Sequence, residues 1–337
     1  MEQTGKKHSI MNALLLLMPF AVTVFCIGIG RYHITPLESL KILISPLTGM
    51  ETEAQEWAVV FNVRLPRILL ALAVGMGLSV SGAAFQALFS NPLATPDTLG
   101  VATGASFGAV LALLFTRNIL IVQISALVMG LLALAGTCVI SRLNGKGSIL
   151  MVVLGGMVVS SLFQALVSLV KYVADPEEDL PAITYWLMGS MSRATYQGLL
   201  VGVPLILLGT AILFLLRWRL NILSLSEDES KALGIDVKRL RLLVMAAATL
   251  VTAACVSLCG QVGWVGLLIP HAARMLYGSD NRKVLPVSIG LGSAFLVAID
   301  TASRAAAAAE IPVSILTAII GAPFFILLLR KTGGAKL

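Results

Sequence analysis

The sequence predicts an all-α polytopic membrane protein of about ten transmembrane helices with an inverted internal repeat. Hydrophobic residues make up 58% of the 337-residue chain, charged residues only 12%, and the mean hydropathy is +0.94. These values lie far outside the range of soluble domains. Gly82 precedes Pro92 by the same interval as Gly260 precedes Pro270, and the two pairs lie about half the chain apart. Matching breaks in apolar runs are typical of duplicated transport proteins.

Ten apolar runs give the expected spans, because about 20 apolar residues are needed to cross the hydrocarbon core. The runs cover residues 10–30, 66–89, 97–116, 119–140, 149–170, 196–216, 242–260, 262–277, 285–303 and 312–329. The eighth run is the shortest and contains Pro270, whereas the second is long enough to extend past the bilayer. Alternation of period two is absent, which argues against an outer-membrane barrel. We expect a single transmembrane domain over residues 1–337, with repeat halves 1–190 and 191–337.

The distribution of basic residues predicts the orientation. With the amino terminus inside, 16 of the 24 Lys and Arg residues fall on the inner side, as the positive-inside rule requires. Both termini should therefore be cytoplasmic, in a multi-pass protein of the cytoplasmic (inner) membrane that contacts lipid. This bias also accounts for the net charge of +7, so no nucleic-acid partner is expected. The first run is too long for a signal peptide and has no clear cleavage site, which favours an uncleaved span.

The spans lack the ionisable residues that drive ion-coupled transport. Six of the ten runs contain no Asp, Glu, Lys or Arg. Asp97 begins the third run at its cytoplasmic edge, and Asp300 and Arg304 can pair near an outer end. We therefore expect energy to enter from another protein.

Catalysis and cofactor binding are not expected of this chain. It has no phosphate-binding loop for ATP and no arrangement of nucleophile, base and orienting group. Cys255 and Cys259 share a helix face, but no further thiol or His lies near them in sequence, which favours buried apolar thiols over a metal site.

The longest inner loop, residues 217–241, has the pattern of a short helix. Ser226, Glu227, Asp228 and Glu229 form a capping box, whose acidic residues favour the positive end of a helix dipole. Gly234 follows Ala232 and Leu233 as the expected carboxy-terminal cap, and a second short turn could start at Asp236. This helix either lies at the headgroups or docks in a groove of a partner protein. The lack of an internal energy source favours docking.

Several spaced motifs give the chain a resemblance to a known family over about residues 64–331. They include Arg64-Leu-Pro-Arg67, the run Gly82 to Ala94 and Leu233-Gly-Ile-Asp-Val237. The block Gly263-Trp-Val-Gly-Leu-Leu-Ile-Pro-His271 is the strongest, and Arg274, Asp280 and Arg282 follow it. In these motifs the chain resembles the FecCD-type permeases of ABC importers for iron–siderophore complexes, haem and vitamin B12.

The resemblance implies ten helices per subunit, a homodimer or close pseudo-dimer, two separate ATPase subunits and an external substrate-binding protein. The loop around residues 226–236 would be the coupling element on which the ATPases dock. The implied cargo is a metal chelate: first a ferric siderophore, then haem or cobalamin, with an oxyanion such as molybdate as a further alternative. An ion-coupled secondary transporter and a non-transporting scaffold are the rival classes.

The resemblance also assigns roles to single residues. Arg64, Arg67 and Arg304 resemble external basic residues that pair with carboxylates of the binding protein; the alternative is snorkelling at helix ends. The loop that contains Gly147 and Ser148 resembles the region that forms the cytoplasmic gate in this family. The pairs Asn91–Pro92 and Pro270–His271 form turns beside the pathway or simply end helices, and the structural role is favoured. Gly100, Gly104 and Gly108 should allow close helix packing.

Overall fold

The computed structural model describes residues 15, 17–142, 149–224, 229, 234–307 and 309–332, and this part of the chain contains helices and no strand. The all-α prediction is therefore confirmed. Six helical runs are long and apolar enough to cross a membrane: Ala54–Leu88, Ile119–Ser141, Ile149–Val173, Tyr196–Leu215, Val237–Cys259 and Asn281–Ala305. Three shorter apolar helices, Leu17–Gly28, Val101–Leu113 and Val313–Leu327, add to them, which is roughly consistent with ten expected spans.

The amino-terminal third contains more helix than the sequence predicts. Helix α2 (Pro36–Thr48) begins with a capping box in which Thr35 and Glu38 bond reciprocally. Helix α3 (Ala54–Ala58) continues through the π-helical segment η1 (Val59–Arg64) into α4 (Leu65–Leu88). The expected helix at 66–89 thus starts twelve residues earlier. The apolar-run criterion missed this extension because Gln55, Glu56 and Asn62 interrupt its apolar residues.

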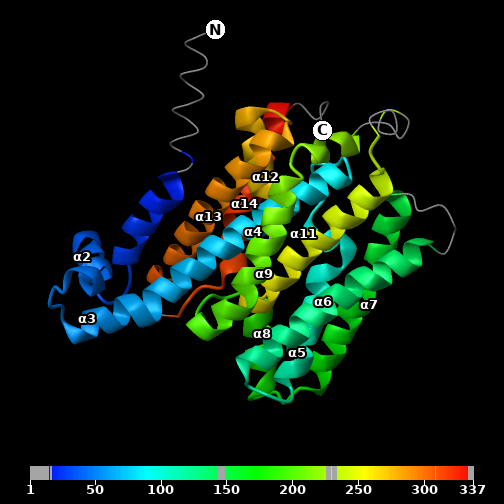
Figure 1. Cartoon of the computed structure of the whole chain (residues 1–337). Helices are drawn as coiled ribbons and strands as arrows, with labels where there is room; N and C mark the ends of the chain where they lie inside the picture. The colour runs from blue at the N-terminus through cyan, green and yellow to red at the C-terminus, as the bar shows by residue number, and fades with distance from the viewer. Residues whose placement is uncertain are drawn as a thin grey trace, which may run out of the picture.

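Helix α4 forms the centre of the molecule and packs against four helices of the second half (Figure 1). These are α9 (Tyr196–Leu215), α11 (Val237–Cys259), α12 (Val265–Tyr277) and α13 (Asn281–Ala305). Two glycine pairs bring backbones into contact: a methyl group at Gly75 would overlap the carbonyl of Gly292, and one at Gly82 would overlap that of Gly266. The two halves of the chain are thus interleaved around α4.

The third apolar run contains two helices rather than one. A 3-10 helix, η2 (Pro96–Leu99), ends at Gly100, whose φ of +73° is a left-handed conformation that favours glycine. Helix α5 (Val101–Leu113) then packs on α6 (Ile119–Arg142), and Gly104 and Gly108 face the backbone of α6. The close-packing prediction is right for Gly104 and Gly108, whereas Gly100 serves as a turn residue.

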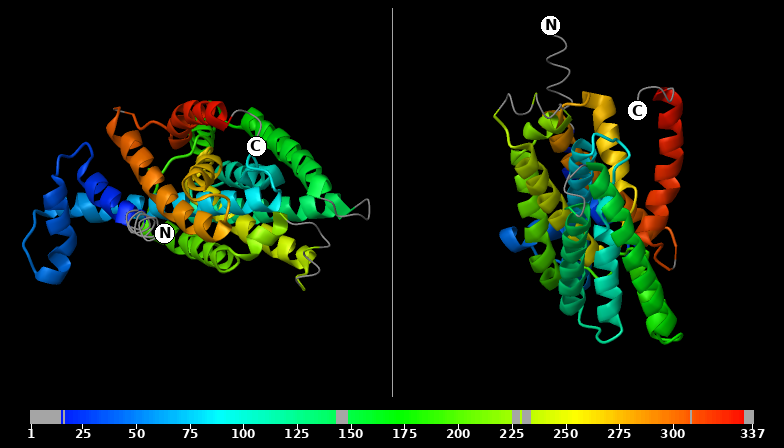
Figure 2. Two further views of the ribbon diagram at one scale, coloured as in Figure 1. Left: turned by 90° about the horizontal axis from the view of Figure 1, so that it is seen from above. Right: turned by 90° about the vertical axis from the view of Figure 1, so that its right-hand side faces the viewer.

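The remaining elements complete the helical bundle (Figure 2). They are α7 (Ile149–Val173), α8 (Asp179–Leu187), the 3-10 helix η3 (Arg219–Ser224) and α14 (Val313–Thr332). Pro270 lies inside α12, so the expectation that Pro270 and His271 form a turn or end a helix is wrong. The helix accommodates the proline because neighbouring helices bury this stretch, and Pro270 and His271 are themselves buried.

Candidate translocation cavity

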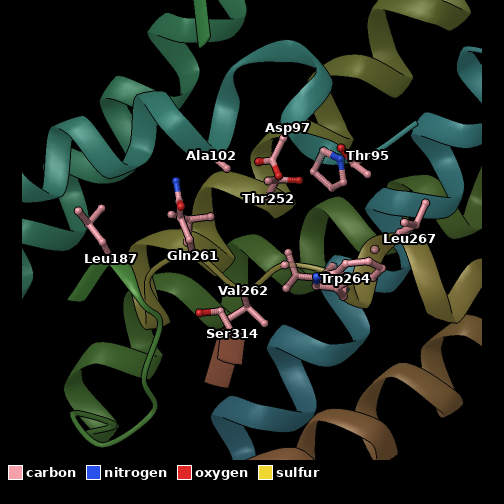
Figure 3. A pocket seen from close by; sticks show the side chains of 15 residues that line it. Thr95, Asp97, Ala102, Leu187, Thr252, Gln261, Val262, Trp264, Leu267 and Ser314 are labelled. Carbon is pink, nitrogen blue, oxygen red and sulfur yellow. The ribbon is translucent and has the colours of Figure 1, made fainter. Parts of the chain in front are cut away.

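A partly open cavity of about 260 Å³ lies where the two expected helix breaks meet (Figure 3). Residues of both breaks line it, together with helices α4, α5, α8, α11, α12 and α14. Its lining residues are Leu78, Thr95, Pro96, Asp97, Ala102, Leu187, Thr252, Val256, Gln261, Val262, Gly263, Trp264, Gly266, Leu267 and Ser314. Tertiary folding therefore joins two motifs that are half a chain apart in sequence.

The first break follows the end of α4. Asn91 shapes an Asx turn there, because its Oδ1 accepts a hydrogen bond from the backbone N–H of Leu93 at 2.9 Å. Thr95 and Thr98 then cap η2 reciprocally, which fixes the backbone on either side of Asp97. Asn91 and Pro92 therefore form a turn, as expected, and this turn leads into the cavity wall.

The second break lies between α11 and α12. Gly260 has a φ of +73° and approaches the carbonyl of Trp186 so closely that a methyl group would overlap it. Trp264 has a φ of +70°, which is rare for a bulky residue and marks the start of α12. Gln261 is held by a hydrogen bond from its Nε2 to Ser106 Oγ at 2.8 Å. The break thus arises from Gly260 and Trp264 and not from Pro270.

A buried glutamine, Gln86, links α4 to α12 by hydrogen bonds. Gln86, on α4, donates from Nε2 to the carbonyl oxygens of Gly266 and Leu267, both at 3.4 Å. Its Oε1 accepts a hydrogen bond from Nη1 of Arg274 on α12. This gives the family-motif Arg274 a structural partner. Sequence reasoning missed Gln86, although a single amide inside an apolar span is a usable signal for such a contact.

Asp97 places a carboxylate in the cavity (Figure 3). It is the only Asp, Glu, Lys, Arg or His among the cavity's lining residues. Its backbone carbonyl accepts from Gly100 N–H at 3.0 Å, so the main chain is engaged in the turn while the side chain faces the cavity.

At the expected inner end, Asp280 anchors two chain segments. It caps α13 by accepting from Arg282 N–H at 3.0 Å, and it accepts from Asn221 Nδ2 on η3 at 2.8 Å. Its ion pair with Arg282 measures 2.9 Å. These hydrogen bonds, chiefly that from the Arg282 side chain, lower the pKa of Asp280 well below its usual range. The start of the 217–241 loop is therefore attached to the α12–α13 turn.

At the expected outer end, the three arginines assigned to docking are buried and bonded within the chain. Arg67 pairs with Asp300 at 2.8 Å and with Glu310 at 2.9 Å. Arg64 donates to the carbonyl of Ile27 at 2.6 Å, and Arg304 donates to that of Cys26, also at 2.6 Å. Their exposed fractions are 8% or less. In this conformation none of them presents a free charge to a binding protein, so the docking assignment does not match their surroundings.

Part of the predicted coupling loop lies outside the described residues: Ser226, Glu227, Asp228, Ala232 and Leu233. Gly147 and Ser148, the predicted gate, also lie outside them. Of the rest, Glu229 is helical, and Gly234 has the φ of +70° expected of a helix cap. Asp236 differs from expectation, because its side chain caps the long helix α11 rather than a short turn. The expected span at 242–260 therefore begins at Val237.

Comparisons with known proteins agree with this architecture. The chain is 42% identical over 94% of both chains to the molybdate import system permease protein of Haemophilus influenzae. It is 41% identical to the cobalamin import system permease protein of Halobacterium salinarum, over 84% of this chain and 75% of that protein. Further relatives are named for iron chelatin and hemin transport.

Solved structures also match this fold. One, described as an inward-facing conformation of an ABC transporter of the metal-chelate type, matches with a TM-score of 0.86 and 40% identity. The match covers 96% of this chain and 99% of that one. A family model named FecCD transport family matches residues 15–331. The chain is therefore a member of the FecCD transport family, the permease subunits of ABC importers.

Proposed function

We propose that two copies of this chain form the membrane path of an ATP-driven importer for a metal chelate, with a ferric siderophore as the first candidate. The observation that carries the proposal is the convergence of both helix breaks on one cavity. Broken helices leave backbone groups free to line a path, and they occur in membranes where they face such a cavity. Haem and cobalamin belong to the same cargo class.

Energy would reach the cavity through the inner loop. Two ATPase subunits would dock on residues 217–241 and move them when ATP closes the ATPases. Asn221 donates a hydrogen bond to Asp280 and accepts one from the backbone N–H of Asn281. These bonds support this route, because they connect the loop to the turn between α12 and α13. Since Gly266 and Leu267 of α12 line the cavity, a displacement of that turn would change its shape.

An external binding protein would deliver the cargo at the opposite end. Docking through Arg64, Arg67 and Arg304 would require the binding protein to replace partners that these residues already have, namely Asp300, Glu310 and backbone carbonyls. The burial of all three favours a structural role at rest.

A second cargo is an oxyanion, which the 42% identity to the molybdate permease favours. The test of both cargoes is uptake into proteoliposomes that contain this chain, its ATPase and its binding protein. The probes are a ferric hydroxamate siderophore, haem, cobalamin and molybdate, with hydrolysable or non-hydrolysable ATP on the ATPase side. We expect uptake of one chelate with hydrolysable ATP only. Uptake driven by an ion gradient without ATP would overturn the proposed function.

A further inference from the structure

The cavity has an uncompensated negative charge. Of its fifteen lining residues, Asp97 alone is ionisable, and the rest are apolar, hydroxyl or amide residues or glycine. The motif residue Arg274 is bound to Gln86 and does not line the cavity. The exposed carboxylate of Asp97 has no ion pair and no side-chain hydrogen bond to any residue in the part of the chain that the structure describes.

The fold holds Asp97 in place without using its side chain. The Thr95–Thr98 capping box fixes the preceding and following peptides, and Gly156 of α7 packs so closely on the carbonyl of Thr98 that a methyl group would overlap it. The backbone of Asp97 therefore has a fixed position, while its carboxylate has no structural partner. An unpaired carboxylate on the wall of a cavity repels anionic solutes and attracts cationic ones.

We propose that Asp97 is a specificity-determining residue that gives the path a negative potential, so that the cargo class is a neutral or cationic chelate and bare oxyanions are disfavoured. This inference rests on the proposed function and separates its two cargo candidates. A dianion placed roughly 6 Å from one carboxylate, even in fully hydrated surroundings, is disfavoured about tenfold relative to a neutral solute. A lower effective dielectric constant would increase that factor.

The potential can be measured without knowing the cargo. Val262 lines the same cavity, and Val262→Cys places a reporter thiol there with little change in size. The full chain in nanodiscs is treated with a cationic trimethylammonium-ethyl and an anionic sulfonatoethyl methanethiosulfonate, and the rates are followed by intact mass. Each rate is divided by that for a small free thiol. The parent chain gives the background from Cys26, Cys138, Cys255 and Cys259.

We expect the cation to react faster, and Asp97→Asn to lower the cation-to-anion ratio about tenfold, because one unit charge acts with opposite sign on the two reagents. Asp97→Glu should keep the ratio. Glu177→Gln, which removes an exposed carboxylate on the loop before α8, should also keep it. An unchanged ratio in Asp97→Asn would overturn the proposal. Failure of both reagents to reach residue 262 would also overturn it, since the carboxylate would then not face an aqueous path.

The cargo claim has a separate readout in the proteoliposomes. The wild-type complex should take up a neutral ferric hydroxamate far faster than molybdate, and molybdate uptake at an equal or higher rate would contradict the inference. Absence of any ATP-dependent uptake would instead contradict the proposed function. In that case the thiol-reactivity ratio would still decide whether Asp97 sets the potential of the cavity.

Discussion

At the scale of single residues, the role of a charged side chain depends on its partners in the folded structure. Arg67 lies in the first turn of α4. From the sequence alone, a basic residue at such a helix end is expected to be exposed at the membrane surface. The structure surrounds it with Asp300 and Glu310 from chain segments more than 230 residues away. Asp300 pairs with Arg304 as expected, at 4.0 Å, and it has a second and closer partner in Arg67 at 2.8 Å. No local pattern in the sequence could reveal this second partner.

Arg67→Met should therefore destabilise the protein strongly. It leaves Asp300 buried without its main counter-charge, and breaking a buried pair costs about 3–5 kcal/mol. Thermal unfolding in detergent, followed by tryptophan fluorescence, gives the shift. Arg117→Ala is the matched control, because the pair of Arg117 with Asp179 is half exposed and such pairs contribute about 1 kcal/mol or less. Equal shifts in both variants would contradict the structural role of Arg67.

The lowered pKa of Asp280 should make the stability of the protein depend on pH. Its folded pKa is depressed by hydrogen bonds from Arg282 and Asn221, so its stabilising contribution is present above the pKa of the unfolded chain. That contribution declines as the pH falls from there through the folded pKa. The difference in unfolding temperature between wild type and Asp280→Asn should thus be largest near pH 7 and shrink towards pH 3. A difference that grows on acidification would show that the carboxylate is not the stabilising form.

Helices pack here through glycine, which sequence patterns indicate only in part. Hydropathy located α4 but could not show which other helices α4 crosses. Its two backbone contacts, Gly75 with Gly292 and Gly82 with Gly266, set the positions of α13 and α12 and thereby one wall of the cavity. Small residues allow such approaches in membranes, where dispersion contacts between backbones replace the hydrophobic effect as the driving force.

Gly82→Ala should separate α4 from α12, because the added methyl group would overlap the carbonyl oxygen of Gly266. Overpacking of this kind costs roughly 1–3 kcal/mol and should also loosen the Gln86 contacts to α12. Unfolding temperature and ATP-dependent uptake would both fall. Gly136→Ala on α6 is the control, since a methyl group there would make only an ordinary contact with Val159, at 3.6 Å, and Gly136 does not line the cavity. A larger effect in the control would contradict the crossing argument.

At the scale of the whole molecule, function requires that motion at the inner loop reach the cavity. Gly234 is the described residue of that loop with the clearest constraint. Its φ of +70° favours glycine, and no atom of the described residues lies within 4 Å of its Cβ position. Gly49 shares both properties at the end of α2, in the segment expected on the opposite side of the membrane.

Gly234→Ala and Gly49→Ala therefore introduce the same backbone strain of roughly 1–2 kcal/mol at two places. We expect Gly234→Ala to reduce transport per ATP hydrolysed, because the strained cap alters the docking surface. Gly49→Ala should leave that ratio unchanged while lowering stability to a similar extent. Uptake and phosphate release measured on the same proteoliposomes give the ratio. An equal ratio in both variants would contradict the coupling role of the inner loop.

The sequence by itself determined the class of this protein. Apolar run lengths predict its membrane helices, the basic bias predicts its orientation, and the spaced motifs identify the family, because these properties are local and additive along the chain. The paired breaks at Gly82–Pro92 and Gly260–Pro270 also predict where helices are interrupted, although the proline was the wrong cause in the second break.

Only the tertiary structure decided which residues meet. It buried Arg64, Arg67 and Arg304, extended α4 to a helical run of 35 residues, and placed Asp97 in a cavity between segments that lie far apart in the chain. The physical reason is that burial and ion pairing depend on contacts between segments that are distant in sequence. The neighbours of a residue in the sequence do not determine these contacts. The charge on the wall of this cavity is therefore a property of the folded molecule.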